Sequence, residues 1–493
     1  MSTSRAKIQP NDACPCLSGK KFKRCCRGII DWTQILRSGR DHRQYLSIRG
    51  RNLLFVEAIC DALGIGGTAE APSLSSYKRA FTPEAVRKIY EAVVEIWPID
   101  TKIQPLLERA SADVSGLYIG DYDPAYLTRA IVRHSIYANK ILLVDPFQHP
   151  YILKDEYNPL FNPNQYRAQT LKNVNFYLSV LPWIDAGIVE FIRTPADFDR
   201  KLNFDLIRRA QQLYKDNPEF EASIRASKED LHERHFKSSA LHMTILSAPD
   251  SYLRRTFRQV DPGNKEFTED DFVDYVNTLR ERDPNFLEPM GTGENNAQLH
   301  MVFAGGTYEM ARLSAQMAGS YLFTDLQARW AMIEHDRKQC SAENRAWSPF
   351  AKAVQNTKLH YLNNLGLEHA LRLRSEHRLE SVRSLLTRVW EKVRSEEPFD
   401  EQAAIHLANE LTEAVDEAEA EWLQIQKDLV KIVGSGLSAG ALSAGPAIAA
   451  GHALWLAVAA VVGTASVGIW SGIQRKAYLK KHPAAFFMEL RSE

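Results

Sequence analysis

A run without charged side chains near the C-terminus constrains the fold of this chain more than any other feature. From Ile432 to Gln474, 43 consecutive residues include no Asp, Glu, Lys or Arg, and basic residues flank both ends. An uncharged run longer than about 18 residues indicates a membrane-spanning helix, and this one is long enough for two. Basic residues on both sides favour a hairpin with both ends in the cytoplasm. We therefore predict a hydrophobic helical hairpin over 432–474 that contacts a membrane.

The two halves of this run differ in how readily they would enter a bilayer. The second half is rich in Val, Leu and Ile, and Trp455 and Trp470 are spaced to suit the two membrane interfaces. The first half is rich in Gly, Ala and Ser, which let helices pack closely in a membrane. We expect a location on the cytoplasmic side of the inner membrane, or in the cytoplasm with regulated membrane insertion. The alternative is a soluble helical pair buried in a large core or an oligomer.

Charge is distributed unevenly along a chain whose net charge is zero. Residues 1–51 contain twelve Lys/Arg and three Asp, whereas residues 395–426 contain ten Asp/Glu and no Lys or Arg. A strongly basic front end indicates an acidic partner, such as a protein, a ribosome, a nucleic acid or anionic lipid. The alternative is that the basic and acidic segments pair with each other within the fold.

Four of the six cysteines lie within thirteen residues near the N-terminus, in the sequence CPCLSGKKFKRCC. Two cysteines one residue apart can bind a metal from one turn, and the Ser-Gly turn brings back a second, adjacent pair. Four thiolates suit tetrahedral Zn²⁺ at about 2.3 Å, in a structural site because no position remains for water. A redox or incomplete cluster is the alternative. The predicted zinc ligands are Cys14, Cys16, Cys25 and Cys26.

This segment, from Asn11 to Arg27, closely resembles the SEC-C motif, the short zinc element at the C-terminus of the SecA translocation ATPase. The CPC sequence, the SGKK turn, an aromatic residue and the paired cysteines carry the resemblance. Leu17 departs from the glycine usual in the CPCGSGKK pattern. The motif also occurs attached to many otherwise unrelated bacterial proteins. The resemblance implies a zinc-stabilised docking element for protein, ribosome or lipid surfaces, and it implies nothing about the rest of the chain.

Apolar runs alternate with helical stretches between residues 113 and 345. Short strands separated by helices predict an α/β domain with a mainly parallel sheet. Helices alone are expected over 31–112, where Thr82 and Pro83 form a helix-start signal. The candidate strands are Gly116–Gly120, Ile141–Val144, Ile188–Ile192, Met301–Ala304 and Tyr321–Phe323.

Three of these strands run directly into an aspartate, at Asp121, Asp145 and Asp325. Sites in open α/β sheets form beyond the carboxyl ends of strands, and carboxylates gathered there suit Mg²⁺ for phosphoryl or phosphodiester chemistry. The alternative is that these aspartates are turn or cap residues. A Gly-Gly-Thr segment between a strand and a helix could hold a phosphate on backbone N–H groups. Its candidate binding residues are Gly305, Gly306 and Thr307.

The C-terminal part reads as all-α, so the predicted fold class is α/β plus all-α. A coiled-coil seam over 404–432 predicts a stalk that leads into the hairpin, and a homo-oligomer formed through this helix is the alternative. The basic, amphipathic tail suits a membrane interface. The predicted order is a zinc knuckle (1–30), a helical segment (31–112), an α/β domain (113–345), amphipathic and coiled-coil helices (346–431), the hairpin (432–474) and the tail (475–493).

Three hypotheses about function follow from these features. The first is a membrane-associated interaction or effector protein, whose zinc knuckle docks a protein, ribosome or nucleic-acid partner and whose hairpin engages the bilayer. Bacterial antiphage defence extends this hypothesis by architectural analogy. The second is a Mg²⁺-dependent nuclease or phosphohydrolase with its active site in the α/β domain. The third is a soluble ribosome or secretion-pathway adaptor. The sequence does not decide whether the chain is an enzyme.

Overall fold

The computed structural model describes residues 8–38, 43–64, 79–110, 115–120, 138–218, 242–249, 269–282 and 308–324, with isolated positions between 127 and 135 and at 222, 240, 329, 332 and 371. The chain forms two compact units, each made of two stretches of sequence. The first combines Met1–Ser111 with Leu142–Gly319, and the second combines Ala112–Ile141 with Ser320–Glu493. The N-terminal cysteines belong to the first unit.

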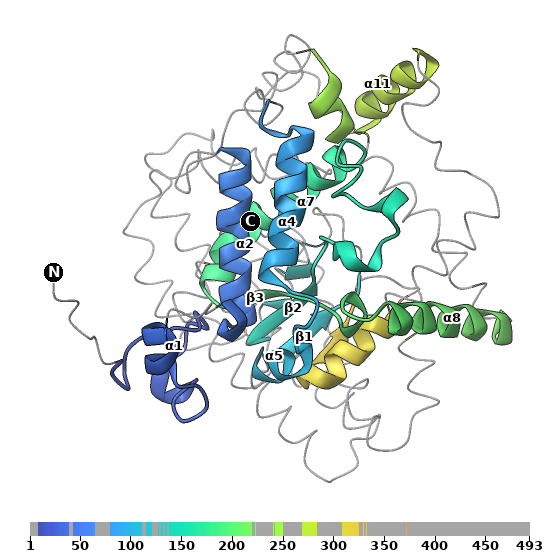
Figure 1. Cartoon of the computed structure of the whole chain (residues 1–493). Coiled ribbons are helices and arrows are strands. Elements are labelled where there is room, and N and C mark those ends of the chain that lie inside the picture. The colour runs from blue at the N-terminus through green and yellow to red at the C-terminus, as the bar shows by residue number, and fades with distance from the viewer. Residues whose placement is uncertain are drawn as a thin grey trace, which may run out of the picture. The chain divides into compact units, whose positions relative to one another are not determined.

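Two long helices of the first unit begin at residue types that cap helices well. Ser47 caps one helix, which ends at Gly64 in a left-handed conformation with a φ of 63°. Another begins at the predicted Thr82-Pro83 pair, where Thr82 is the cap and Pro83 the first helical residue. The helix that Ser47 caps packs against the helix that begins at Pro83 and against a third helix, which begins at Arg167. The three helices (Figure 1) are α2 (Ile48–Leu63), α4 (Pro83–Ile96) and α7 (Arg167–Asp185).

Four short strands form one sheet, in the order β3-β2-β1-β4. They are β1 (Ser115–Tyr118), β2 (Lys140–Val144), β3 (Val189–Ile192) and β4 (Tyr321–Phe323). β1 pairs with β4 in parallel, with Gly116 opposite Tyr321 and Tyr118 opposite Phe323. Four of the five predicted strands are thereby confirmed. The fifth, Met301–Ala304, lies outside the described residues.

An aromatic cluster forms the core of the first unit. Phe55 of α2 packs edge-on against Phe147 and against Tyr177 of α7, with ring centroids 5.1 Å and 5.4 Å apart. Tyr177 stacks on Phe191 of β3 at 4.0 Å, and Tyr90 of α4 contacts Phe147 at 5.7 Å. All five side chains are buried. Large aromatic residues dominate burial energetics, so this cluster joins the three helices to β3.

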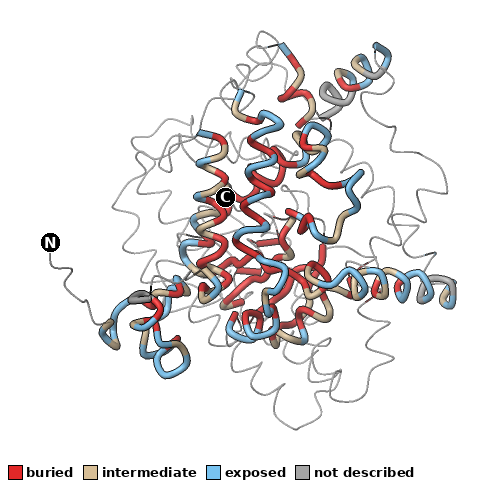
Figure 2. Tube along the Cα trace, in the orientation of Figure 1, coloured by how far each residue is buried: buried red, intermediate tan, exposed pale blue. Residues whose placement is uncertain are grey.

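The remaining elements are shorter or more exposed. Figure 2 shows that buried residues gather in the strands and that exposed residues predominate along α8. The further helices are α1 (Trp32–Ser38), α5 (Ile103–Ala110), α8 (Arg200–Asp216) and α11 (Glu269–Arg282). The 3-10 turns are η1 (Phe22–Arg24), η2 (Arg43–Tyr45), η3 (Pro150–Ile152), η4 (Asp155–Tyr157) and η5 (Pro195–Asp197).

Most of the predicted C-terminal elements lie outside the described residues. These are the coiled-coil helix over 404–432, the hairpin over 432–474 and the tail over 475–493. Within the part of the chain that is described, no helix combines the length and apolar character needed to cross a bilayer. The predicted membrane segment therefore stays a prediction, and so do the predicted domain boundaries.

Candidate metal centre

A short antiparallel bridge between Ala13 and Lys21 folds the N-terminal segment back on itself. The Cys14 N–H donates to the Lys20 carbonyl at 3.0 Å, which reinforces this bridge. The single turn η1 follows and leads directly into the second cysteine pair. The segment thus brings the two cysteine pairs together, and we call residues 10–30 the cysteine knuckle.

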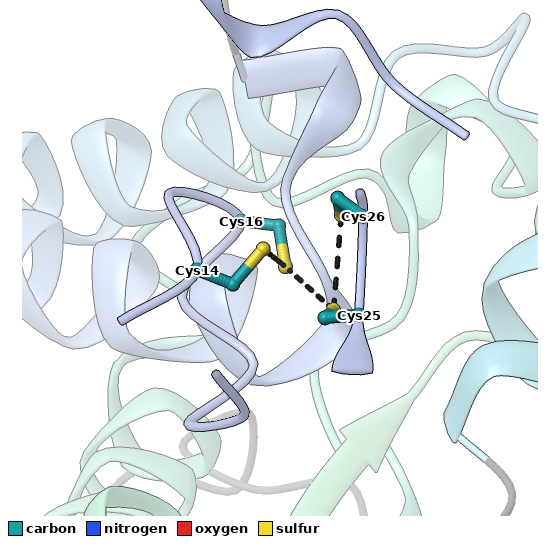
Figure 3. Close-up of side chains that lie close together, drawn as sticks. All are labelled: Cys14, Cys16, Cys25 and Cys26. Carbon is teal, nitrogen blue, oxygen red and sulfur yellow. Dashed lines mark hydrogen bonds between the residues drawn. The ribbon is translucent and has the colours of Figure 1, made fainter. Parts of the chain in front are cut away.

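The sulfur atoms of the four cysteines form one cluster (Figure 3). The Sγ of Cys16 lies 3.3 Å from that of Cys14 and 3.4 Å from that of Cys25. The Sγ atoms of Cys25 and Cys26 are 3.7 Å apart, and all four sulfurs lie within 4.8 Å of one another. A tetrahedral centre with zinc–sulfur bonds of about 2.3 Å has sulfur–sulfur edges of about 3.8 Å. The cluster therefore has the dimensions of a four-sulfur zinc site.

The chemistry of the cluster also fits a cation. Cys14, Cys16 and Cys26 are each 2% exposed, and the described cysteines are free rather than disulfide-bonded. Burial raises the pKa of both Cys14 and Cys26 to about 11, so the thiolate forms are unfavourable in the protein alone. A bound Zn²⁺ would supply the positive charge that lets the thiols ionise. The four predicted ligands, including Cys25, are the residues that would hold it.

Trp32 provides a second observation that fits a metal-bound thiolate. Its side chain is 1% exposed and packs in one cluster with Cys14, Cys16, Cys26 and Leu46. The indole N–H is buried and has no hydrogen bond of normal geometry within the described chain. The same indole lowers the pKa of Cys26, against the rise that burial causes. A thiolate on the metal would give this donor a charged acceptor, and such outer contacts orient metal ligands.

Leu17 explains why glycine is usual at its position in the pattern that this segment resembles. Its φ is 61°, which lies in the left-handed region. Residues with a Cβ pay about 1–2 kcal/mol there, whereas glycine does not. The turn nevertheless closes, because the Leu17 N–H donates to the Cys14 carbonyl at 2.9 Å. The departure from the pattern changes the strain of the turn and leaves the ligands in place.

The outer surface of the cysteine knuckle is strongly basic. Five of its side chains are exposed cations that form no ion pair with any described residue. Two apolar side chains lie exposed in the same segment, Leu17 at 44% and Ile29 at 72%. We call the five cations the basic face, and its members are Lys20, Lys21, Lys23, Arg24 and Arg27.

Of the three aspartates predicted at strand ends, the described residues include Asp145 alone, and it is buried. One carboxylate oxygen lies 3.1 Å from Nη2 of Arg193 and accepts the Tyr177 hydroxyl at 2.6 Å. The other accepts the Phe147 N–H at 2.9 Å. Burial raises the pKa of Asp145, while Arg193 and the hydrogen-bond donors oppose that rise. These contacts place Asp145 in the core of the first unit, and the catalytic role predicted for it remains untested.

The other predicted site residues lie outside the described part of the chain. These are Asp121 and Asp325 at strand ends, and Gly305, Gly306 and Thr307. The described residues just before Asp121 and Asp325 still take part in the pairing of β1 with β4. The Ile119 N–H donates to the Phe323 carbonyl at 2.9 Å, and the Thr324 hydroxyl donates to the Ile119 carbonyl at 3.3 Å.

Comparison with known proteins identifies the cysteine segment. Residues 11–28 match the family described as the SEC-C motif, which confirms the resemblance drawn from the sequence. No curated protein and no solved structure matches the chain. The protein therefore carries a SEC-C motif whose four cysteines fit a zinc site, and the match covers a small N-terminal part of 493 residues.

Proposed function

We propose that this protein uses its cysteine knuckle, organised by zinc, to dock onto an acidic macromolecular partner. The observation that carries the proposal is the basic face. Its cations are exposed, they lack ion-pair partners among the described residues, and they project from a segment that a metal would hold in one conformation. Fixed cations attract an acidic surface more strongly than mobile ones, because less conformational freedom is lost on binding.

The charge count supports a net attraction. Zinc with four thiolates contributes two negative charges, so residues 1–51, with twelve Lys/Arg against three Asp, stay clearly basic. Association driven by such a surface should weaken steeply as salt screens it. An acidic partner could be a nucleic acid or an acidic protein, and salt dependence distinguishes the two. Binding to the phosphates of a nucleic acid releases counterions, so the logarithm of the binding constant falls steeply and linearly with the logarithm of salt concentration.

The test compares binding by the full-length protein to ribosomes, to RNA and to a polyglutamate chain over a range of salt concentrations. A triple variant, Lys21→Ala, Lys23→Ala and Arg24→Ala, should lose most binding at low salt. Its salt slope should fall by about one for each phosphate contact removed. A control triple variant should bind like the wild type, because it removes the same charge from exposed positions elsewhere. Equal binding by the two variants would overturn the proposal. The control carries Lys88→Ala, Lys102→Ala and Lys201→Ala.

The charge-free run supports a second activity, engagement of a bilayer by residues 432–474. An uncharged run of this length with flanking basic residues is the sequence signal for insertion. The protein should then co-sediment with membranes after lysis and resist carbonate extraction, and a chain lacking 432–474 should not. Recovery of both chains in the supernatant would exclude this activity.

The β1–β4 pairing favours one enzymatic alternative, Mg²⁺-dependent phosphoryl or phosphodiester chemistry. The strand order reverses between β1 and β4, and ligands of open α/β sheets bind beyond the carboxyl ends of strands at such a point. Asp121 and Asp325 are the first carboxylates after these two strands. Hydrolysis of nucleotides or nucleic acids by the purified protein should be lost in Asp121→Asn and Asp325→Asn. Full hydrolysis in both variants would remove this alternative.

A further inference from the structure

The cysteine knuckle is hydrogen-bonded to the first turn of α2. The carbonyl of Cys16 accepts two hydrogen bonds from Ser47, one from its N–H at 2.9 Å and one from its hydroxyl at 2.8 Å. The same hydroxyl accepts the Gly50 N–H at 3.0 Å and so caps α2. One side chain therefore caps the helix and holds the backbone of a metal ligand.

Gly50 lets the helix approach the knuckle this closely. A Cβ at this position would lie 2.7 Å from the carbonyl oxygen of Cys16 and 3.0 Å from the Cβ of Leu17. Both distances are shorter than side chains normally tolerate, and the first involves backbone that cannot rotate away. The helix start and the cysteine turn are thus in direct contact at a residue without a side chain.

Arg49 extends this contact to the end of α7. Its Nη1 donates to the Leu17 carbonyl at 2.7 Å, and its Nε donates to the Ile184 carbonyl at 3.0 Å. Its Nη2 lies 3.0 Å from the Asp185 carboxylate and also donates to the carbonyl of that residue at 2.5 Å. The Arg49 side chain is only 12% exposed, and a cation at the last carbonyls of a helix is electrostatically favoured.

Two glycines with left-handed backbone border the same guanidinium. Gly19 of the knuckle has a φ of 76°, and Gly187, just after α7, has a φ of 71°. A Cβ on either residue would lie within 3.9 Å of Arg49 side-chain atoms. The arginine is therefore enclosed between the cysteine turn and the end of α7, instead of extending into solvent.

We propose that Arg49 is a positioning residue for the metal centre, which makes the centre an integral part of the helical body and transmits its occupancy to α2 and α7. Metal binding fixes the Cys14–Leu17 turn, the turn fixes Arg49, and Arg49 fixes the last turn of α7. By thermodynamic linkage the effect is reciprocal. If bound metal strengthens the contacts of Arg49 with the end of α7 by some factor, those contacts strengthen metal binding by the same factor. Loss of Arg49 should therefore raise the Kd for the metal by that factor. The proposal does not depend on the partner of the basic face.

The first test measures metal affinity in the full-length protein by competition with a chromophoric chelator. Arg49→Ala should raise the Kd for Zn²⁺ on the order of tenfold, within the usual range of coupling between sites. Arg49→Lys restores the charge but not the forked set of donors, so it should recover affinity only in part. The Co²⁺-loaded Arg49→Ala protein should keep the absorption of a tetrahedral four-thiolate centre, because the ligands are intact.

The second test measures amide hydrogen exchange in the metal-loaded and chelated proteins. In the wild type, removing the metal should speed exchange at the end of α7, around Ile184–Gly187, as well as in the knuckle. In Arg49→Ala the α7 end should exchange at one fast rate whether metal is present or not. Arg87→Ala, which removes an exposed arginine of α4, serves as the control and should behave like the wild type.

The outcomes decide between an integral centre and an independent one. If chelation leaves α7 exchange unchanged in the wild type, the knuckle folds as a separate appendage and the proposal is overturned. It is equally overturned if Arg49→Ala binds Zn²⁺ with the affinity of the wild type. A general loss of folding would instead speed exchange throughout β2 and β3, which this experiment detects directly.

Discussion

The cysteine knuckle and the aromatic core of the first unit bury acidic side chains in opposite ways. The knuckle buries sulfurs from four cysteines that face one another, and it contains no buried cation among its described residues. The core buries Asp145 together with Arg193, whose side chain is 1% exposed, and adds donors from Tyr177 and Phe147. The cysteine knuckle therefore needs a bound metal cation to balance its thiolates, whereas the core balances the Asp145 carboxylate with Arg193 of the same chain.

This difference shows which region depends on solution conditions. A segment of about twenty residues cannot bury enough apolar surface to fold alone, so its stability follows metal supply and thiol redox state. The aromatic core has its own packing, and both partners of its ion pair, Asp145 and Arg193, are part of the chain. The stability of the cysteine knuckle should thus follow metal binding, and Arg49 is the route by which that change would reach α2 and α7.

Metal removal should give the largest effect and separate the two regions most clearly. Structural zinc contributes about 10–16 kcal/mol of apparent binding free energy in small domains at neutral pH. A zinc chelator should therefore abolish amide protection in residues 11–28 while β2 and β3 keep theirs. Cys26→Ser should reproduce this result, and Cys60→Ser, which changes a cysteine outside the cluster, should not. Loss of protection in β2 and β3 on chelation would contradict the division.

Breaking the ion pair of the core should have the next largest effect. Arg193→Met leaves the Asp145 carboxylate buried without its cation, which should lower the free energy of unfolding by about 3–5 kcal/mol. Urea unfolding of the metal-loaded protein measures this change. Arg87→Met removes a cation from an exposed pair with Glu84 and should cost about 0–1 kcal/mol. Similar losses in the two variants would show that burial does not set the value of the core pair.

His149 is a second buried titratable group of the first unit, and burial keeps its imidazole neutral. Burial lowers the pKa of His149 to about 4. Its Nε2 lies 2.9 Å from the Trp97 carbonyl oxygen, and its Nδ1 accepts the Tyr151 N–H at 3.2 Å. These partners assign the proton to Nε2, and a second proton on Nδ1 would face the Tyr151 donor. The folded protein therefore favours the neutral imidazole over the protonated one.

The pH dependence follows from this lowered pKa. A histidine in the unfolded chain titrates near pH 6.5, so the unfolded state takes up a proton before the folded state does. The contribution of His149 is complete above about pH 7 and should shrink by about 2–3 kcal/mol on acidification to pH 4.5. Urea unfolding at pH 7 and pH 4.5 should show a smaller acid loss in His149→Asn. The same loss in both proteins would rule out His149 as its source.

The smallest effect is expected at Leu17, and it tests strain in the cysteine turn. Leu17→Gly should stabilise the metal-loaded knuckle by about 1 kcal/mol, because glycine adopts a φ of 61° without a steric penalty. Leu17→Ala keeps the Cβ and should give no such gain. The melting temperature of the metal-loaded protein, or its zinc affinity, reports the difference. Equal values for the two variants would mean that the turn carries no strain.

Local signals in the sequence predicted the parts of the fold that depend on neighbouring residues. The ligands Cys14, Cys16, Cys25 and Cys26 lie close together in the chain, so their spacing alone indicated a shared metal. Apolar runs located the four strands, and Thr82-Pro83 marked the start of α4. Each of these signals acts over a few residues, which is the range at which a single sequence is informative.

Contacts between distant residues were not predictable in this way. Arg49 meets Leu17 from 32 positions away and Asp185 from 136 positions away. Only a Ser at the helix cap followed by Gly50 inside the helix could have hinted at a close approach there. Asp145 shows the converse problem, because an aspartate after a strand looks the same in sequence whether it pairs with a buried arginine or lines a site.

Zinc K-edge X-ray absorption of the purified full-length protein tests the central claim most directly. We expect one zinc per chain, surrounded by four sulfur atoms at about 2.3 Å, with no nitrogen or oxygen ligand. A protein purified without zinc that fails to take it up, or a centre with fewer than four sulfurs, would contradict it.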